Sequence, residues 1–265
     1  MSDKILVFIP CYNCEPQIPR VLAQFTPDMA KHFHEVLVLD NNSRDNTAAV
    51  ASQAALKVPG LKVTVARNVA NYNLGGSHKS AFAYARAHGF THVVVLHGDD
   101  QGSIADLIPV LTSGRHREMD ACLGARFMRG SRLKGYSRFR IFGNLVFNLL
   151  FTLGTLRSVH DLGSGLNIFG RTVFEDPKVH RYADDLRFNV YLLLGMFSAR
   201  MRTEFFPISW REDDQVSNVK MASQAMRTLK LLWQSTLSGQ RFWGADHRDQ
   251  PFDNYTFDVL SENGH

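Results

Sequence analysis

The sequence predicts an α/β fold, in which helices flank one mostly parallel, doubly wound sheet within a single domain. Four apolar segments of strand length alternate with helix-like segments in the first part of the chain, and short links join them. Such alternation is typical of parallel strands connected by crossover helices. Apolar residues make up 45% of the 265 residues and charged residues 21%, so the chain can bury a core and is not a disordered protein.

The strands are predicted from apolar runs. Lys4–Ile9 shows no alternation of polar and apolar residues, which is typical of a strand buried on both faces. The later strands are expected at Val36–Leu39, Leu61–Ala66, Thr91–Leu96 and Asp120–Ala125, and a strand pair is expected over Glu204–Trp210 around Pro207.

The helices are predicted from prolines, polar turns and apolar residues at helical spacing. Pro16 and Pro19 mark the start of the first helix, and a polar turn that begins at Asp40 caps the next one. The later helices are expected at Thr47–Leu56, from Gly75-Gly76 to about His88, and over 138–156, 184–199 and 216–237. The polar tail from Gly239 is expected to be irregular.

Charge, cysteine content and apolar run length exclude several classes of protein. Thirty Lys and Arg against 25 Asp and Glu give a net charge of +5, too small to predict a nucleic-acid partner. Cys11, Cys14 and Cys122 predict free thiols in a reducing, cytoplasmic setting rather than a disulfide framework. The longest uncharged apolar stretch, 141–156, would span about 24 Å as a helix, less than the roughly 30 Å of a bilayer core. No membrane span is therefore expected.

The candidate site is expected at the carboxyl ends of the strands, where open parallel sheets bind ligands. The segments there are Pro10-Cys11-Tyr12-Asn13, Asp40-Asn41-Asn42-Ser43, Asn71–Gly76 and His97–Gln101. They supply an aromatic face, carboxylates and backbone amides, which suits a nucleotide whose base stacks and whose phosphates need a cation. Asp40 alone could instead satisfy the backbone amides of a turn.

His97-Gly98-Asp99-Asp100-Gln101 is the sharpest candidate for a metal site. Alternate residues of an extended segment share a face, so His97, Asp99 and Gln101 would converge. One imidazole, one carboxylate and one amide oxygen suit Mg²⁺ or Mn²⁺, and the imidazole favours Mn²⁺. The alternative is a loop of hydrogen-bonding turn residues, with Asp100 as a helix cap.

Seven short motifs in a fixed order resemble family 2 glycosyltransferases with the Rossmann-like GT-A fold. They are Ile9–Asn13, Val38–Thr47, Asn71…Gly75-Gly76, His97–Gln101, Gly124-Ala125-Arg126, Asp161–Gly165 and Pro207–Arg211. The resemblance covers about residues 4–220 and is strongest to the dolichyl-phosphate mannosyltransferase and polyprenyl-phosphate glycosyltransferase branch. It implies a single GT-A domain over 1–237, with a nucleotide-sugar half at 1–126, an acceptor half at 127–237 and a polar tail at 238–265.

The resemblance also implies a UDP- or GDP-linked sugar donor, a divalent metal and inversion at the anomeric carbon. The implied metal ligands are His97, Asp99 and Gln101, and the implied catalytic residues include Asp99 and Arg126. The implied nucleotide-sugar contacts are Pro10, Tyr12, Asn13, Glu15, Asp40, Asn42, Asn71, Gly75, Asp99, Arg126, Arg140 and Arg211.

Three positions depart from the pattern of the family. His97 replaces an aspartate, which removes one negative charge from the metal set. Cys14 stands where the family has a nucleotide-contacting glutamate, with Glu15 one residue further on. Asn41-Asn42 replace the usual Asp-Gly, which loosens any inference about the base.

The acceptor stays open between a polyprenyl phosphate and a glycan hydroxyl. A hydroxyl must lose a proton and needs a carboxylate base, for which Asp184 and Asp185 are candidates, whereas a lipid phosphate is already an anion. The two acids could instead be favourable charges at the start of a helix.

The segment from Arg126 to Arg157 is basic and apolar, and no acidic residue occurs between Cys122 and His160. This composition suits peripheral contact with an anionic membrane, at the inner face of the cell membrane. The alternative is a core helix or a dimer helix, which leaves a homo-oligomer open.

Two rival functions remain. A sugar-nucleotidyltransferase would carry a glycine-rich basic loop after its first strand, where this chain has Pro10–Asn13. A non-catalytic nucleotide- or sugar-binding module of the same fold would be consistent with His97 and Cys14.

Overall fold

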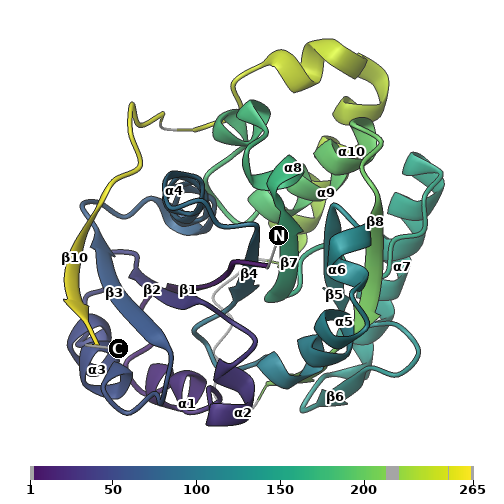
Figure 1. The fold of residues 1–265 in the computed structure, drawn as a ribbon. Helices are drawn as coiled ribbons and strands as arrows, with labels where there is room; N and C mark the ends of the chain where they lie inside the picture. Colours follow the sequence, from purple (N-terminus) through teal and green to yellow (C-terminus); the bar gives the residue numbers. More distant parts are fainter. Residues whose placement is uncertain (1–2, 213–220, 250, 264–265) are drawn as a thin grey trace.

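A computed structural model describes residues 3–212, 221–249 and 251–263 of the chain. Its main sheet has the strand order β10-β3-β2-β1-β4-β7-β5-β8 and runs through the middle of the molecule (Figure 1). The pairs β1–β2, β2–β3, β1–β4 and β5–β8 are parallel, whereas β7 and β10 pair antiparallel to their neighbours. The predicted α/β fold with a mostly parallel sheet is therefore confirmed.

The strands of the main sheet are β1 Ile5–Cys11, β2 Glu35–Asp40, β3 Lys62–Asn68, β4 His92–Leu96, β5 Ala121–Ala125, β7 Leu166–Gly170, β8 Thr203–Pro207 and β10 Phe257–Glu262, and the short strands β6 Arg132–Lys134 and β9 Ser209–Arg211 pair with each other. The α-helices are α1 Ile18–Leu22, α2 Pro27–Ala30, α3 Thr47–Ala55, α4 Asn73–Ala87, α5 Ile108–Thr112, α6 Arg115–Glu118, α7 Arg138–Thr155, α8 Arg171–Phe174, α9 Phe188–Ser198 and α10 Met221–Gly244. Two 3₁₀ turns lie at Ile104–Leu107 and Pro177–Arg181.

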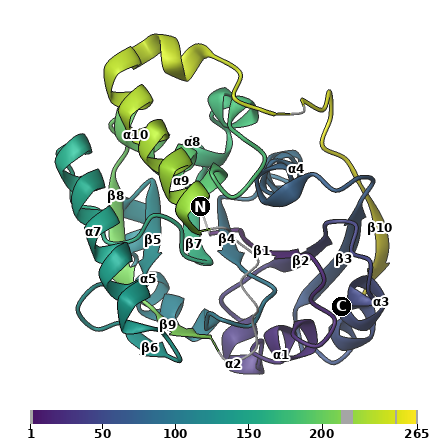
Figure 2. The same cartoon turned by 180° about the vertical axis from the view of Figure 1, so that it is seen from behind.

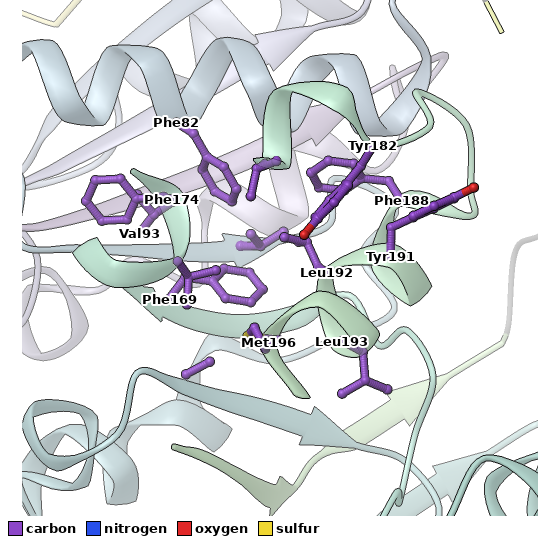
Figure 3. Close-up of a cluster of buried hydrophobic side chains, with 14 of the residues drawn as sticks. Phe82, Val93, Phe169, Phe174, Tyr182, Phe188, Tyr191, Leu192, Leu193 and Met196 are labelled. Atoms are coloured by element: carbon purple, nitrogen blue, oxygen red, sulfur yellow. The ribbon is translucent and has the colours of Figure 1, made fainter. Parts of the chain in front are cut away.

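The central strand β1 is buried along its whole length, as its continuous apolar run predicts. Leu6 and Phe8 enter one hydrophobic cluster, and Val7 and Ile9 enter another. Because side chains alternate across a strand, the two clusters lie on opposite faces of the sheet. Figure 3 shows the first cluster, to which α4 contributes Phe82 and α9 contributes Phe188, Leu192 and Met196.

His78 on α4 lies inside this aromatic cluster. Its ring centroid is 5.2 Å from that of Phe8, and its Nδ1 is 2.8 Å from the carbonyl oxygen of Leu74. Burial lowers the pKa of His78 to about 3. Because the unfolded chain binds this proton near pH 6.5, we expect stability to fall as the pH falls from about 6.5 towards 3, by up to about 1.4 kcal/mol per pH unit.

Urea unfolding of the wild type and of His78→Leu, each at about pH 5 and about pH 7.5, tests this expectation. The variant should lose less stability than the wild type between the two pH values. Equal losses would contradict the assignment of the effect to His78.

The C-terminal tail corrects one prediction. The tail was expected to be irregular from Gly239, and the backbone does leave the helical conformation at Gly239 (φ 48°, ψ −131°). The helix then resumes and ends at Gly244, and Phe257–Glu262 forms β10 against β3. β10 is the edge strand of the sheet, and most of its side chains are exposed, although Phe257, Val259 and Leu260 make half of its residues apolar. Asn263 anchors it: its Oδ1 accepts from the amide of Val63 at 2.6 Å.

Two further elements differ from the sequence expectation. The helix expected over 184–199 begins at Phe188, because residues 182–187 form turns. β7 was not predicted and lies antiparallel between β4 and β5. Of the helix expected over 216–237, residues 216–220 lie outside the described residues, and the rest belongs to α10.

Within the part of the chain that the structure describes, no helix is both long and apolar enough to cross a bilayer.

Candidate active site

The loops that follow β1 and β2 lock together at the carboxyl edge of the sheet. The amide of Asn13 donates to Ser43 Oγ at 2.9 Å, and the amide of Arg44 donates to Asn13 Oδ1 at 3.0 Å. Asn13 and Asn42 have φ values of 54° and 60°, a left-handed conformation that asparagine tolerates better than most residues. Tyr12 is 43% exposed on this surface and is available to stack on a planar ring.

Asp40 lies beneath this surface and not on it. Its carboxylate accepts bonds from the amide and the hydroxyl of Ser43, and it pairs with Arg67 Nε at 3.2 Å. Asp40 is 1% exposed, so here it serves as the turn residue that the sequence allowed as the alternative. Its predicted contact with the nucleoside stays a prediction.

Asn41 has a connecting role that the sequence analysis missed. Its Nδ2 donates to Asn71 Oδ1 at 2.8 Å, and its Oδ1 accepts from Asn68 Nδ2 and from the amide of Tyr72, both at 2.9 Å. These bonds fix the end of β2 to the loop that leads into α4 and Gly75. Asn71 is exposed at this rim, where it was expected among the nucleotide contacts.

Cys14 and Glu15 take different directions after β1. Cys14 is buried in the core, so the residue at the family's glutamate position faces away from the exposed surface. Glu15 turns towards the next loop, where its carboxylate accepts from the amide of Asn46 at 3.0 Å. Its predicted contact with the nucleotide is not tested by this arrangement. All three cysteines are free, as predicted.

His97 and Asp99 follow β4 and are partly buried. The amide of His97 donates to the carbonyl oxygen of Gly165 at 2.9 Å, and Asp99 Oδ1 accepts from the amide of Gln101 at 3.2 Å. Burial, with Arg126 nearby, lowers the pKa of His97 to about 4. Burial also raises the pKa of Asp99 to about 6. The imidazole is therefore neutral near pH 7, the form that can ligate a metal.

One observation supports a divalent cation at the predicted metal ligands His97, Asp99 and Gln101. His97 Nε2 is buried with no hydrogen-bond partner, and such an orphaned nitrogen calls for an explanation such as an ion. Asp99 is the carboxylate of the set, and Gln101 adds an amide oxygen. Among the described residues there is no group of three or more His, Cys, Asp or Glu side chains that could hold a metal, so a cation here would depend on Gln101 and on ligand oxygens.

Asp100 belongs to a different network from its neighbour Asp99. Its carboxylate is 2.6 Å from Arg20 Nε and also pairs with Arg211. Arg211 in addition donates to the carbonyl oxygen of Asp100 at 2.7 Å. Asp100 is not the helix cap that the alternative interpretation allowed, because Ser103 stands at the cap position of the next helical turn. Arg211, predicted to meet phosphates, holds Asp100 in this structure.

A basic groove of about 430 Å³ runs beside this network. The residues that line it include Gln101, Arg20 and Arg211, together with Arg132 and Lys134 of β6. In the sequence, Arg132 and Lys134 stand out only as part of a basic segment. Their place in the groove follows from the pairing of β6 with β9, which no local sequence signal predicts.

Arg126 is aligned by a buried acid. Its Nε and Nη2 each bond to Asp161 at 2.8 Å, in a fork, and its guanidinium carbon lies 5.2 Å from the ring centroid of Trp210. Arg140 pairs with Glu212 and lies 4.9 Å from the ring centroid of Tyr136, whose hydroxyl is 3.4 Å from Arg126. The structure thus gathers Arg126 and Arg140 around Tyr136.

The two candidate bases are both paired with cations. Lys79 Nζ lies 2.6 Å from Asp184 Oδ1, inside the molecule, and the hydroxyl of Tyr255 donates to Asp184 Oδ2 at 3.0 Å. Asp185 pairs with Arg187 at 2.9 Å. Lys79 and Tyr255 were missed by the sequence analysis, because their partner is more than 70 residues away along the chain.

The peptide of Asp184 also contacts α4. The amide of Gly75 donates to the carbonyl oxygen of Asp184 at 2.6 Å, and a Cβ on Gly75 would lie 2.6 Å from the carbonyl oxygen of Ala183. The close approach leaves no room for a side chain, so Gly75 has a packing role in addition to its predicted role in nucleotide binding.

Comparison with known proteins identifies a family. A model described as Glycosyl transferase family 2 matches residues 6–176. The chain is 25% identical over 179 residues to the polyprenol monophosphomannose synthase of Mycolicibacterium smegmatis, covering 66% of this chain and 64% of that protein. It is 25% identical to the dolichyl-phosphate beta-glucosyltransferase of Drosophila melanogaster, covering 90% of this chain and 77% of that protein. The chain thus spans somewhat less than two thirds of the mycobacterial relative.

Solved structures share the fold. Glucosyl-3-phosphoglycerate synthase from Mycobacterium tuberculosis, in complex with Mn²⁺, UDP-glucose and glycerol 3-phosphate, matches with a TM-score of 0.62 and 16% identity, over 89% of this chain and 81% of that one. A mannosyltransferase from Pyrobaculum calidifontis, in complex with GDP-Man and Mn²⁺, matches with a TM-score of 0.59 and 14% identity, over 92% and 70%. At these identities the likeness concerns the fold alone.

Proposed function

The chain belongs to glycosyl transferase family 2 and has its GT-A fold, and on this premise we propose that it moves a sugar from a nucleoside diphosphate to a polyprenyl phosphate. The enzyme class, a glycosyltransferase, follows from the family. The family match also speaks against the sugar-nucleotidyltransferase and the non-catalytic module.

The choice of acceptor rests on one observation: each of the two candidate bases, Asp184 and Asp185, forms an ion pair with a basic side chain. A glycan hydroxyl needs a base to take its proton, and the base should be a carboxylate free to accept it. Asp184 is neutralised by Lys79 and Asp185 by Arg187. A lipid phosphate is an anion at neutral pH and attacks without a base. The names of the curated relatives, polyprenol and dolichyl-phosphate enzymes, support the same acceptor.

The donor would lie across the interlocked loops after β1 and β2. Tyr12 offers an exposed ring for the base, and Asn13, Asn42 and Asn71 are exposed around it. His97, Asp99 and Gln101 would hold Mn²⁺ or Mg²⁺, which when bound would neutralise charge on the departing diphosphate. Mn²⁺ in the complexes of structural relatives supports this cofactor.

The protein's own arginines would stabilise the remaining charge of the leaving group. Arg126 is held in one orientation by the fork to Asp161, so it needs little reorganisation during the reaction. Arg132 and Lys134 line the basic groove beside Gln101, which suits phosphate oxygens of the donor or the acceptor. Arg140 and Arg211, paired with Glu212 and Asp100, stay predicted phosphate contacts.

A thermal-shift panel tests the donor and the metal. UDP, GDP, CMP and dTDP are each added with Mn²⁺, Mg²⁺ or EDTA. One nucleotide at about 100 times its Kd should stabilise the protein by about 2.7 kcal/mol, or roughly 5–10 °C in Tm, and only with metal. A shift that survives EDTA would contradict the metal site.

Transfer assays with paired acceptors test the rest of the proposal. The donor sugar that matches the stabilising nucleotide is incubated with a short polyprenyl phosphate or with the corresponding polyprenol, which has a hydroxyl in place of the phosphate. Transfer to the phosphate alone is the expected result. Transfer to the polyprenol, or to glycan hydroxyls only, would overturn the choice of acceptor.

A further inference from the structure

The helix α7 is not a core helix, in contrast to one of the two alternatives that its sequence allows. Of its 18 residues, Asn148 and Phe151 are buried. Phe139 is 77% exposed, Phe142 66% and Leu153 63%. The exposed large apolar residues of this segment are Phe139, Phe142, Leu145, Val146, Leu149, Leu150, Leu153 and Leu156. So many exposed apolar side chains on one helix mark an interaction surface.

The helix α10 extends the same surface. It lies beside α7 at one side of the molecule in both views (Figures 1 and 2). Gly154 of α7 allows this contact, because a Cβ there would lie 3.0 Å from Leu232 of α10. Met226, Trp233 and Leu237 of α10 are exposed. Between the helices runs an apolar groove of about 780 Å³, lined by Leu150, Leu229, Leu232 and Trp233 among others.

The charge of this surface is of one sign. Neither α7 nor α10 contains an Asp or a Glu, whereas they contain Arg138, Arg140, Arg227, Lys230 and Arg241. A self-complementary contact between two copies would bring these cations near each other. An anionic lipid surface instead complements them, and it accepts apolar side chains below the headgroups.

We propose that α7 and α10 together form a membrane-docking face, which lies on a bilayer that contains anionic phospholipid. The exposed apolar side chains of α7 and α10 enter the headgroup–acyl boundary, with Trp233 at the interface. The exposed Arg138, Arg227, Lys230 and Arg241 of the same helices contact lipid phosphates, whereas Arg140 is paired with Glu212. The 18 residues of α7 make a helix of about 27 Å, long enough to lie flat along the surface over most of its length. This docking needs no donor, metal or acceptor, so it stands or falls independently of the transfer reaction.

Trp233 gives a direct readout. The protein has three tryptophans, and Trp210 and Trp243 are buried whereas Trp233 is 69% exposed. Vesicles of phosphatidylcholine with phosphatidylglycerol should shift the emission of Trp233 to the blue, and vesicles of phosphatidylcholine alone should do so much less. High salt should weaken the response, because it screens the basic residues. The shift should disappear in Trp233→Phe.

Vesicle co-sedimentation with matched variants completes the test. Leu149→Glu combined with Leu153→Glu should lower the fraction bound at least about tenfold, since it places two anions on the face. Leu56→Glu is the control, because Leu56 is 70% exposed beside α3, on the opposite side of the molecule in both views. The control should bind like the wild type, and all variants should keep the wild-type Tm.

Three results would overturn the proposal. The wild type does not bind the anionic vesicles; the double variant binds them as well as the wild type does; or the wild type is a dimer in solution that the double variant converts to monomers, with no vesicle binding, in which case a second copy covers the face.

Discussion

Replacement of Asp99 with Asn is expected to lower metal-dependent nucleotide binding and sugar transfer at least about 100-fold. Asp99 is the carboxylate of the predicted metal set; it is partly buried, and no basic side chain among the described residues bonds to it. Asn keeps the size of the side chain and removes the negative charge that a divalent cation needs. Titration calorimetry with the nucleotide found in the thermal-shift panel, with and without Mn²⁺, measures the loss of binding.

The stability of the same variant separates the site from the fold. Because burial raises the pKa of Asp99 to about 6, the ionised form costs the native state free energy at pH 7.5. Asn should therefore leave the metal-free protein as stable as the wild type, or more stable by about 1–3 kcal/mol. A loss of nucleotide binding and transfer without a loss of stability would indicate that Asp99 serves ligand binding and not the fold.

Asp100→Asn is the matched control, one residue along the chain. Asp100 pairs with Arg20 and Arg211 inside the protein, so Asn should lower the Tm and leave the metal dependence of nucleotide binding in place. If Asp100→Asn abolishes the metal response and Asp99→Asn does not, the metal set is wrong and Asp100 is the ligand.

The sequence predicts the nucleotide-sugar half better than the acceptor half, because the signals for the first half lie in short continuous segments of the chain. Strands such as Lys4–Ile9 are continuous apolar runs, and the polar residues after them must reach the same edge of a parallel sheet. The same short segments therefore predict both the strands and the site residues that follow them. The positions of Tyr12, His97 and Asp99 follow from them.

The partners of charged residues could not be predicted in the same way. Arg126 meets Asp161 across 35 residues, and Arg140 meets Glu212 across 72. No periodicity links such positions, so the arginines were expected to meet phosphates alone. β10 was missed for a related reason: Phe257–Glu262 is a short segment in a polar tail, and nothing in it indicates that β3 offers an open edge.

Lys79→Met is the substitution with the largest expected effect on stability. It would leave the Asp184 carboxylate buried with only the hydroxyl of Tyr255 and without its cation. Removal of one partner of a buried ion pair typically costs about 3–5 kcal/mol. For a chain of this size we expect a fall in Tm of roughly 6–20 °C, measured by thermal and urea unfolding.

The double variant Lys79→Met with Asp184→Asn decides between two roles of Asp184. Asn has no charge to leave unpaired and can still accept from Tyr255, so the double variant should regain most of the stability lost by Lys79→Met. If Asp184 only fixes the loop against Gly75, the double variant also keeps its transfer to polyprenyl phosphate. If Asp184 is a base, the double variant folds and binds the nucleotide but transfers no sugar. That second outcome would favour a glycan hydroxyl over a polyprenyl phosphate as the acceptor, because only a hydroxyl needs a base to remove its proton.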